Sequence, residues 1–593
     1  MNQPLSQEAS TITTPVLEFE PRLALTKIAS CARTYAAEVT SGLLLAFMGL
    51  QMFAVIWQKS ITVDELVLIP SAYYHLVDGD FQLVNEHPPL PKIIAAIPLL
   101  FVQPNEVTPT GNSPNRSEAI WAREVGFWGQ NPEKSESLSF WPRVPMILLS
   151  MGLGILIFWF GRLLFNSRVA VLAVTLFTLE PTLIGHGRVV HTDVPAAFGY
   201  LLFFMTLYGY FRRRTWRWAA YLGAATAIAI LTKYSMLLLG LVLAPVFIIE
   251  FWRHKERGKL LIHAATTFIT IVLVVNAAYF FKHAAVNEAD TQWLTTYMPA
   301  HAQNLMTLSR LLSYVLPKEF VLGILYQFWH NGEGHAAGLL GMYSQTGWWY
   351  YFPVAFLLKT TLPFLFLSLA AIGWSIFRLV RHRESNFLWL LLPAAIYSVF
   401  VLFSHIDIGV RYLIPLFPFL IILGAALLSQ LLQLKARKVG LSLVVVLVAW
   451  MGIEALRAFP DHITYMNQFA RRAPHWWYLS DSNVEWGDDI HDLARFLQAQ
   501  GEHSVLDGTL GGFGILPLYH IENVDALTAQ PGAPDQPRYL AVGASFLNGS
   551  TIPAGPPGSG RETQAGRVNY FAAYRQRKPD AIIGGSIYVF RVR

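Results

Sequence analysis

Ionisable side chains gather where long apolar runs of this sequence end. Asp64 and Glu65 follow the first such run. Two adjacent carboxylates at a membrane edge suit general-base catalysis or cation binding. An alternative is that Asp64 caps the helix that begins there. The two interpretations predict different partners for the Asp64 carboxylate, and sequence alone leaves both open.

A second group of ionisable residues occupies 186–195, between two further apolar runs, and includes Arg188, His191 and Asp193. The His-x-Asp spacing is compatible with a divalent metal ion, although two ligands do not establish a metal site. Asp193 also precedes Val194-Pro195, so it is a candidate cap for the next helix. We therefore treat Asp193 as a candidate site residue and leave metal dependence open.

Two cations stand alone at the same predicted face of the membrane. Lys233 lies in a short turn, and Arg411 begins a late apolar run next to Tyr412. Phosphate binding would explain both, because arginine offers a planar fork and lysine a point charge. The alternative is a structural ion pair, such as Arg411 with Asp407. His87, in a proline-rich turn, is a further candidate for ligand binding.

These residues need a membrane scaffold to position them. Of 593 residues, 54% are hydrophobic and only 14% charged, whereas soluble domains carry about 25% charged residues. A bilayer-spanning helix needs about 20 mostly apolar residues. Eleven runs qualify: 40–57, 144–160, 168–184, 194–211, 218–232, 235–252, 260–281, 351–377, 387–404, 411–433 and 439–458. The shorter, proline-broken run 90–102 is predicted to be a helix at the outer surface.

Basic residues orient this bundle. One set of short segments is rich in Lys and Arg, for example 212–217 and 253–259, whereas the opposite short loops hold only Arg188, Lys233 and Arg411. The positive-inside rule places the basic set in the cytoplasm. We expect a cytoplasmic N-terminus and an external C-terminus. The net charge of +6 follows from the same rule and does not indicate a nucleic-acid partner.

The predicted fold is an all-α polytopic membrane domain of about eleven helices with a small C-terminal α/β extracytoplasmic domain. Residues 1–38 form a cytoplasmic segment. Residues 39–458 form the membrane domain, with outer loops at 58–143 and 282–350, and 459–593 form the tail. In the tail we predict a helix at 488–500 and strands at 504–511, 538–543 and 581–592.

Taken in order along the chain, several motifs resemble the bacterial protein O-mannosyltransferase-like glycosyltransferases (family 39) of the membrane-integral C-type superfamily. They are Val63-Asp64-Glu65 with His87-Pro88-Pro89, Gly185-His186-Gly187-Arg188 with Thr192-Asp193-Val194-Pro195, Gly347-Trp348-Trp349-Tyr350-Tyr351-Phe352-Pro353 with Lys359, Gly409-Val410-Arg411-Tyr412, and Asp481-Ser482-Asn483-Val484-Glu485-Trp486-Gly487-Asp488-Asp489.

The resemblance implies a polyprenyl-phosphate sugar donor and transfer to an acceptor hydroxyl at the outer face of a plasma or inner membrane, facing the periplasm or cell exterior. It implies that Asp64 is the catalytic base, that Glu65 supports it, and that Asp193 helps to shape the acceptor or donor site. It implies no certain cofactor, with a divalent ion left open. The acceptor, whether glycan, lipid or protein, is not implied. Substrate-binding candidates are His87, Arg188, His191, Lys233, Arg411 and Tyr412.

The alternative class is a transporter or flippase of polyprenyl lipids or glycolipids. Transporters place their sites near the bilayer midplane, among broken helices and internal repeats. This sequence shows no repeat, and its ionisable residues lie at the ends of apolar runs. We therefore favour an inverting glycosyltransferase over a transporter.

Overall fold

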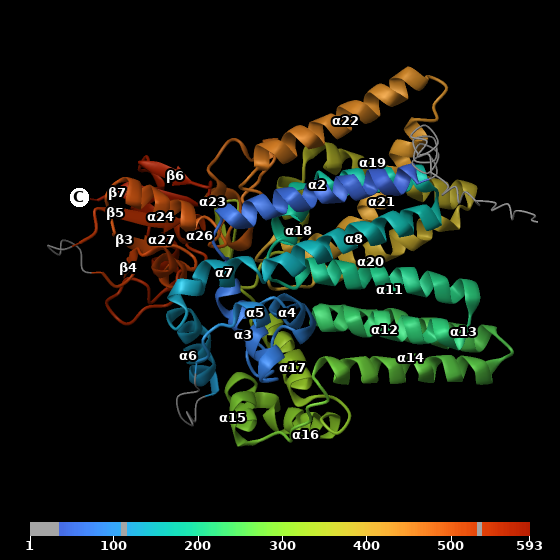
Figure 1. The fold of residues 1–593 in the computed structure, drawn as a ribbon, viewed down its shortest axis with the longest axis horizontal. Helices are drawn as coiled ribbons and strands as arrows, with labels where there is room; N and C mark the ends of the chain where they lie inside the picture. The colour runs from blue at the N-terminus through green and yellow to red at the C-terminus, as the bar shows by residue number, and fades with distance from the viewer. Residues whose placement is uncertain (1–34, 108–115, 530–535, 593) are drawn as a thin grey trace, which may run out of the picture.

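A computed structural model describes residues 35–107, 116–529 and 536–592. Most of the predicted cytoplasmic segment, residues 1–34, lies outside this range. Long helices run side by side along the molecule, and the tail sits at one end of the bundle (Figure 1). The predicted fold class, a helical membrane domain with a small α/β tail, is confirmed.

The eleven predicted runs are all helical. They form α2 (Ala36–Gln58), α8 (Arg143–Leu164), the bent pair α9 (Ser167–Thr178) and α10 (Pro181–Gly187), α11 (Asp193–Arg213), α12 (Trp216–Thr232), α13 (Gly240–Arg253), α14 (Arg257–Ala278), α19 (Leu362–His382), α20 (Leu388–Leu402), α21 (Phe417–Leu431) and α22 (Arg437–Ala458). Nine stretches of the described residues are long and apolar enough to cross a membrane, or ten with the bent pair. Helix α12, with 17 residues, is slightly shorter.

Two predicted spans are broken by proline. The run 168–184 bends by 70° between α9 and α10, where Pro181 opens the second helix. The run 351–377 splits into α18 (Tyr351–Lys359) and α19, with Thr361 in extended conformation before Leu362-Pro363. Proline fits the first turn of a helix, whereas further along it removes a backbone hydrogen bond and kinks or breaks the helix. Both breaks lie at the tail end, where the candidate site lies.

Both predicted outer loops lie at the tail end of the bundle (Figure 1). The first holds α3 (Glu65–Val77), α4 (Pro89–Ala96), α5 (Leu99–Val102), α6 (Arg116–Gly129) and α7 (Ser135–Phe140). The second holds α15 (Glu288–Tyr297), α16 (Ala302–Leu312), α17 (Lys318–Glu333) and the hairpin of β1 (Ala337–Leu339) and β2 (Met342–Ser344). The predicted helix at 90–102 is therefore two short helices, α4 and α5.

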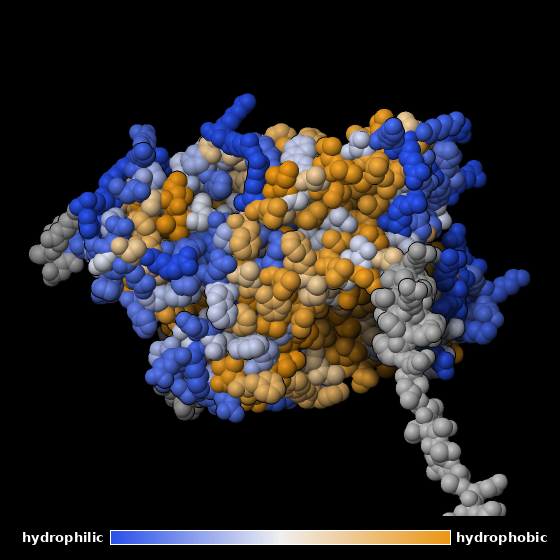
Figure 2. All heavy atoms as spheres, turned by 45° about the horizontal axis from the view of Figure 1, so that its top comes forward, coloured by the Kyte–Doolittle hydropathy of each residue, from blue (hydrophilic) through white to orange (hydrophobic). Residues whose placement is uncertain are grey.

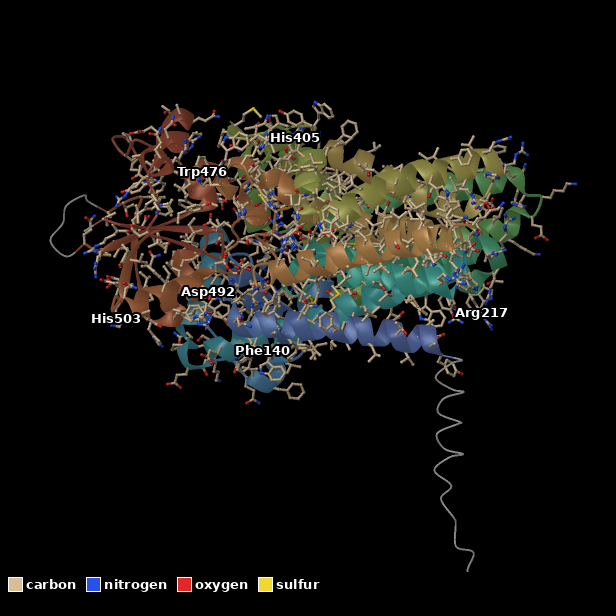
Figure 3. The ribbon with its side chains drawn as sticks, turned by 90° about the horizontal axis from the view of Figure 1, so that it is seen from above. Phe140, Arg217, His405, Trp476, Asp492 and His503 are labelled. Atoms are coloured by element: carbon tan, nitrogen blue, oxygen red, sulfur yellow. The ribbon has the colours of Figure 1, made fainter. Side chains whose placement is uncertain are left out.

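An apolar belt separates two hydrophilic ends of the molecule (Figure 2). Arg217 lies at the end opposite the tail, whereas Asp492 lies in the tail (Figure 3). The basic segments and the tail thus occupy opposite ends, as the charge pattern predicts. Which end faces the cytoplasm stays a prediction.

The tail is built on a five-stranded sheet in the order β4-β3-β5-β7-β6. Its elements are α23 (His475–Tyr478), α24 (Ile490–Ala499), β3 (Ser504–Gly508), α25 (Gly512–Ile515), β4 (Glu522–Asp525), β5 (Tyr539–Gly543), α26 (Ala544–Asn548), α27 (Gln564–Asn569), α28 (Ala572–Arg575), β6 (Ala581–Ile583) and β7 (Ile587–Arg591). Strand β4 was not predicted. The predicted strand 581–592 is a hairpin, because Gly584 and Gly585 both take positive φ and form the turn.

The tail shares its core with the first loop. Leu66 and Ile69 of α3 belong to the same buried cluster as Leu493 of α24 and Val505 of β3. Apolar burial of this kind is the main favourable contribution to folding. The tail therefore packs as a continuation of the membrane domain, and its residues can reach the ends of the spanning helices.

Candidate active site

Asp64 stands at the N-terminal end of α3 and makes no capping bond with its side chain. Its Oδ2 lies 2.9 Å from Nη1 of Arg411 and 3.2 Å from Nε2 of His191. The partner of Arg411 is thus Asp64 rather than Asp407, whose carboxylate accepts from the backbone N–H of Trp348 at 2.7 Å. The capping interpretation of Asp64 is wrong, and its carboxylate points to the functional candidates.

Asp193 continues this arrangement. Its Oδ1 accepts a hydrogen bond from Lys233 Nζ at 2.6 Å, and its Oδ2 lies 2.8 Å from Nδ1 of His191. Lys233 also lies 4.0 Å from the ring centroid of Tyr412. His191 therefore stands between the two carboxylates. Arg411 contacts both Asp64 and His191, and Lys233 contacts Asp193. Four candidates from separate parts of the chain form one network of two acids and two cations.

The network keeps Asp64 ionised. Burial alone would raise the pKa of Asp64, but the charges of Arg411 and His191 outweigh it and hold that pKa well below its usual range. Its side chain is 31% exposed, whereas that of Arg411 is 5% exposed. Burial and the charges of His191 and Lys92 lower the pKa of the His87 imidazole, which is therefore neutral near pH 7. The site thus presents a charged carboxylate to its surroundings.

That carboxylate faces a cavity of about 690 Å³, within the range of small-molecule sites. The lining includes Asp64, His87, His191, Lys233, Arg411 and Tyr412. Six of the nine residues that the sequence singled out therefore meet at one hollow. Asp193 stands directly behind Lys233 and His191.

Part of the cavity lining is apolar and reaches the surface of the bundle. It includes Leu237 of η2 (Tyr234–Leu239), Leu241 of α13, and Phe400 and Phe403 at the end of α20. Leu241 is 79% exposed and Phe403 75% exposed. Both side chains belong to or adjoin helices suited to cross a membrane. The cavity thus joins a charged pocket to a surface that faces lipid.

A third wall comes from α17, which the sequence analysis did not single out. Tyr326, Gln327 and His330 line the cavity from this helix. The Gln327 amide donates to the carbonyl of Glu86 at 2.9 Å and ties the wall to the turn that carries His87. Burial lowers the pKa of His330 to about 4, so this wall adds no positive charge near pH 7. The spacing of Tyr326 and His330 on one helical face was the available signal.

Comparison with known families gives one match by sequence. Residues 124–312 match the model for dolichyl-phosphate-mannose-protein mannosyltransferases. This central third of the chain is therefore similar to that family. The matched segment contains Arg188, His191, Asp193 and Lys233. A search of curated proteins finds no match.

Solved structures of other membrane proteins resemble the chain at low identity. Apo ArnT from Cupriavidus metallidurans gives a TM-score of 0.48 at 14% identity, covering 93% of this chain and 98% of that one. ArnT bound to undecaprenyl phosphate gives 0.44 at 16% identity, covering 81% and 75%. The Archaeoglobus fulgidus oligosaccharyltransferase in its apo form gives 0.43 at 12% identity, covering 90% and 68%. All three TM-scores lie below 0.5.

Besides Asp193, two candidates do not line the cavity, Glu65 and Arg188. Glu65 is fully buried, and its carboxylate accepts from Arg143 Nε at 2.8 Å and from the N–H of Val190 at 2.9 Å. Arg188 is fully buried and donates to Asp488 of the tail at 2.8 Å. Both side chains hold loops together behind the site. Neither is placed to touch a molecule in the cavity.

The described residues hold one carboxylate group with metal-like spacing, formed by Asp461, Asp489 and Asp492. The Lys59 ammonium occupies its centre, 2.5 Å from Asp489 and 2.7 Å from Asp492. Burial would lower the pKa of Lys59, but these carboxylates outweigh it and raise the pKa above its usual range. In the cavity, His191 presents opposite ring nitrogens to Asp64 and Asp193. These three residues do not converge on one point, so this arrangement does not fit a shared metal ion.

Proposed function

We propose that this chain transfers a sugar from a polyprenyl-phosphate donor to an acceptor hydroxyl at the outer face of the membrane. One observation carries the proposal. A charged carboxylate and two buried cations meet in a single cavity whose apolar lining reaches the lipid-facing surface. A polyprenyl-phosphate sugar has the matching sequence of groups, with a polar sugar, a phosphate and an apolar chain.

Lys233 and Arg411 are the proposed partners of the donor phosphate. Charge-assisted hydrogen bonds to phosphate are stronger than neutral ones. In the absence of donor, these cations are held by Asp193 and Asp64. A phosphate entering the cavity would share or replace those contacts, so the site is electrostatically prepared for one anionic group. The polyprenyl chain would leave over Leu241 and Phe403.

Asp64 is the proposed general base. Its Oδ2 contacts Arg411 and His191. Within the described part of the chain its Oδ1 has no hydrogen-bond partner. An acceptor O–H would donate its proton to Oδ1 while its oxygen bonds to the anomeric carbon. The bond from that carbon to the phosphate oxygen breaks, and the phosphate leaves with the electron pair. A single displacement inverts the anomeric centre.

Two effects would lower the barrier. Proton transfer to a positioned base contributes about 10²–10⁴-fold. Fixed cations facing the leaving phosphate stabilise its developing charge, which is usually the larger contribution. As the phosphate takes up Arg411, the pKa of Asp64 would rise toward the value that suits a base, because its main neutralising charge moves away.

The test is transfer from polyprenyl-phosphate-linked hexoses and pentoses by the full chain in lipid, with donor binding measured in the same samples. Asp64→Asn should abolish both sugar transfer and the slow hydrolysis of the donor, while the donor still binds. Glu133→Gln, at an exposed acid of the same loop, should behave as wild type. Normal transfer by Asp64→Asn would exclude Asp64 as the base. Failure of every donor to bind would favour the transporter alternative.

The acceptor and the compartment are part of the proposal. A glycan, a lipid or a protein hydroxyl would enter from the tail end, where both large loops lie (Figure 1). That end would face the periplasm or the cell exterior, because the basic segments lie at the other end (Figure 3).

A further inference from the structure

Residues 485–489 form a strip between the tail and the membrane domain. On the tail side, the Glu485 carboxylate accepts from the N–H groups of Leu510 and Ser545 at 2.7 and 2.8 Å. These N–H groups follow the parallel strands β3 and β5, where open α/β sheets bind ligands. A Cβ on Gly543 would lie 1.7 Å from Glu485, so only glycine leaves room. The chain's own carboxylate fills this crevice.

On the membrane side, the same strip holds two cations. Asp488 pairs with Arg188 at 2.8 Å, and Asp489 pairs with Lys59 at 2.5 Å. The carbonyl of Asp488 also accepts from the N–H of Ser60 at 3.0 Å. The strip is thereby fixed to the end of α2 and to the loop before α11. Burial makes these contacts costly to break, because each would leave an unpaired charge.

Trp486 lies in the middle of the strip and is 1% exposed. The guanidinium of Arg411 lies 4.4 Å from its ring centroid, and the His191 ring lies 5.4 Å away. The carbonyl of Trp486 accepts from the N–H of Val63 at 2.8 Å, one residue before Asp64. The side chain of Trp486 therefore touches both partners of Asp64, and its backbone holds the neighbouring residue.

We propose that Trp486 is a positioning residue that sets the Arg411 guanidinium and the His191 ring against Asp64, so that the tail forms part of the catalytic centre. A desolvated cation over an indole face is held more firmly than one over any other side-chain ring. The ring fixes the side of Arg411 away from the cavity, and the cation can turn its other edge to Asp64 or to phosphate. This inference rests on the proposed function, since it assigns Trp486 a role toward the proposed base.

The experiment compares Trp486→Ala and Trp486→Phe with Trp477→Phe, in full chain in lipid. Trp477 belongs to the same tail, but its ring is 36% exposed and it makes none of the site contacts described above. For Trp486→Ala we expect kcat to fall about 10²-fold, the scale of a misplaced catalytic group. Trp486→Phe should recover part of this loss, because a ring remains under Arg411. Trp477→Phe should leave kcat and KM unchanged.

The pH profile separates positioning from simple support of the fold. When Arg411 is no longer held beside Asp64, the carboxylate loses its neutralising charge and its pKa rises. The acidic limb of kcat/KM should then move to higher pH in Trp486→Ala, and part of the way in Trp486→Phe. Unchanged kcat, or a loss of activity that follows only the folded fraction with an unmoved limb, would overturn the proposal. If Trp486→Ala does not fold, Trp486→Phe decides by the same limb.

A failure of the wider function gives a different pattern. If Asp64→Asn removes transfer but neither Trp486 variant shifts the limb, only the positioning role is wrong. If Asp64→Asn transfers normally, Asp64 is not the base, and the proposed role of Trp486 is wrong as well.

Discussion

Asp64 and Glu65 are neighbours in sequence with opposite environments. Asp64 faces the cavity with 31% of its side chain exposed, and its charge is shared with Arg411 and His191. Glu65 is completely buried and held by Arg143 and the backbone N–H of Val190. The first carboxylate lies where a substrate can reach it. The second is sealed behind it and fixes the loop from which Asp64 projects.

The contrast extends to two layers of charge. The layer at the cavity contains Asp64, Asp193, Lys233 and Arg411, whose cations can accept an incoming anion. The layer behind contains the pair Glu65–Arg143, which holds the first loop to α8, and the Arg188–Asp488 pair and Lys59 cluster, which join the membrane domain to the tail. Charge in the first layer is available for chemistry, and charge in the second gives the first its geometry. Loss of charge in the two layers should therefore have different consequences.

The largest expected effect is a crossed result for the two neighbours. Asp64→Asn should lower transfer about 10²–10⁴-fold with little change in thermal unfolding. Glu65→Gln should destabilise the protein by about 3–5 kcal/mol, because it leaves Arg143 buried without its counter-charge. Transfer rates per folded molecule and unfolding temperatures in detergent measure the two effects separately.

A double variant provides the control for Glu65. Replacing both members of a buried ion pair by well-packed hydrophobic residues of similar volume is often neutral for stability. Glu65→Leu combined with Arg143→Met should therefore recover much of the unfolding temperature. If Asp64→Asn unfolds as readily as Glu65→Gln, the two acids belong to one layer and the comparison is wrong.

The next effect concerns Lys59, the charge at the centre of three tail-side carboxylates. Lys59→Ala should lower the free energy of unfolding by about 3–5 kcal/mol, as the loss of one partner of a buried ion pair does elsewhere. Oxygen atoms of Asp461, Asp489 and Asp492 lie within 4.8 Å of one another and would then be free to bind Ca²⁺. Calcium at about 100 times its Kd would return about 2.7 kcal/mol. Unfolding temperatures with Ca²⁺ and with chelator give the measurement.

There are two matched controls. The first is the wild-type protein, and the second is the double variant Lys59→Ala/Asp489→Asn. Neither should gain stability from Ca²⁺, because the first keeps its ammonium and the second lacks a central ligand. A calcium-independent unfolding temperature in Lys59→Ala would show that the carboxylates move apart once the lysine is removed.

Sequence predicted the scaffold well, because apolar runs and basic segments are local patterns with direct physical causes. The isolation of Lys233 and Arg411 also identified cavity residues, since an unexplained cation near a membrane is costly. The sequence pattern could not predict which acids and cations form ion pairs. Asp64 and Arg411 are 347 residues apart, and nothing local to Arg411 distinguishes Asp64 from Asp407 as its partner.

The same limit explains the residues that were missed or placed differently. The sequence predicts Arg188 as a ligand-binding cation, because its partner Asp488 reaches it only when the tail folds. Trp486 appeared as part of a motif, but its contact with Arg411 depends on how the strip crosses the membrane domain. The helix break at Thr361 was likewise hidden within an apolar run, where hydropathy is continuous and only Pro363 marks the break.

The smallest effect tests whether the tail is fixed by Glu485. Burial, opposed by two backbone hydrogen bonds, raises the pKa of Glu485 to about 8 in the folded protein, against about 4.3 in an unfolded chain. The folded state therefore binds more protons than the unfolded state between these values, so stability falls as pH rises through this window. From about pH 6 to about pH 7 the free energy of unfolding should fall by about 1.4 kcal/mol.

The Glu485→Gln variant keeps an acceptor oxygen but does not titrate, so its unfolding temperature should fall less over that interval. Glu522→Gln, at an exposed acid on β4, should keep the wild-type slope. Equal slopes in all three proteins would mean that Glu485 is ionised in the folded tail, and that the two N–H groups at the ends of β3 and β5 bind it as a true anion.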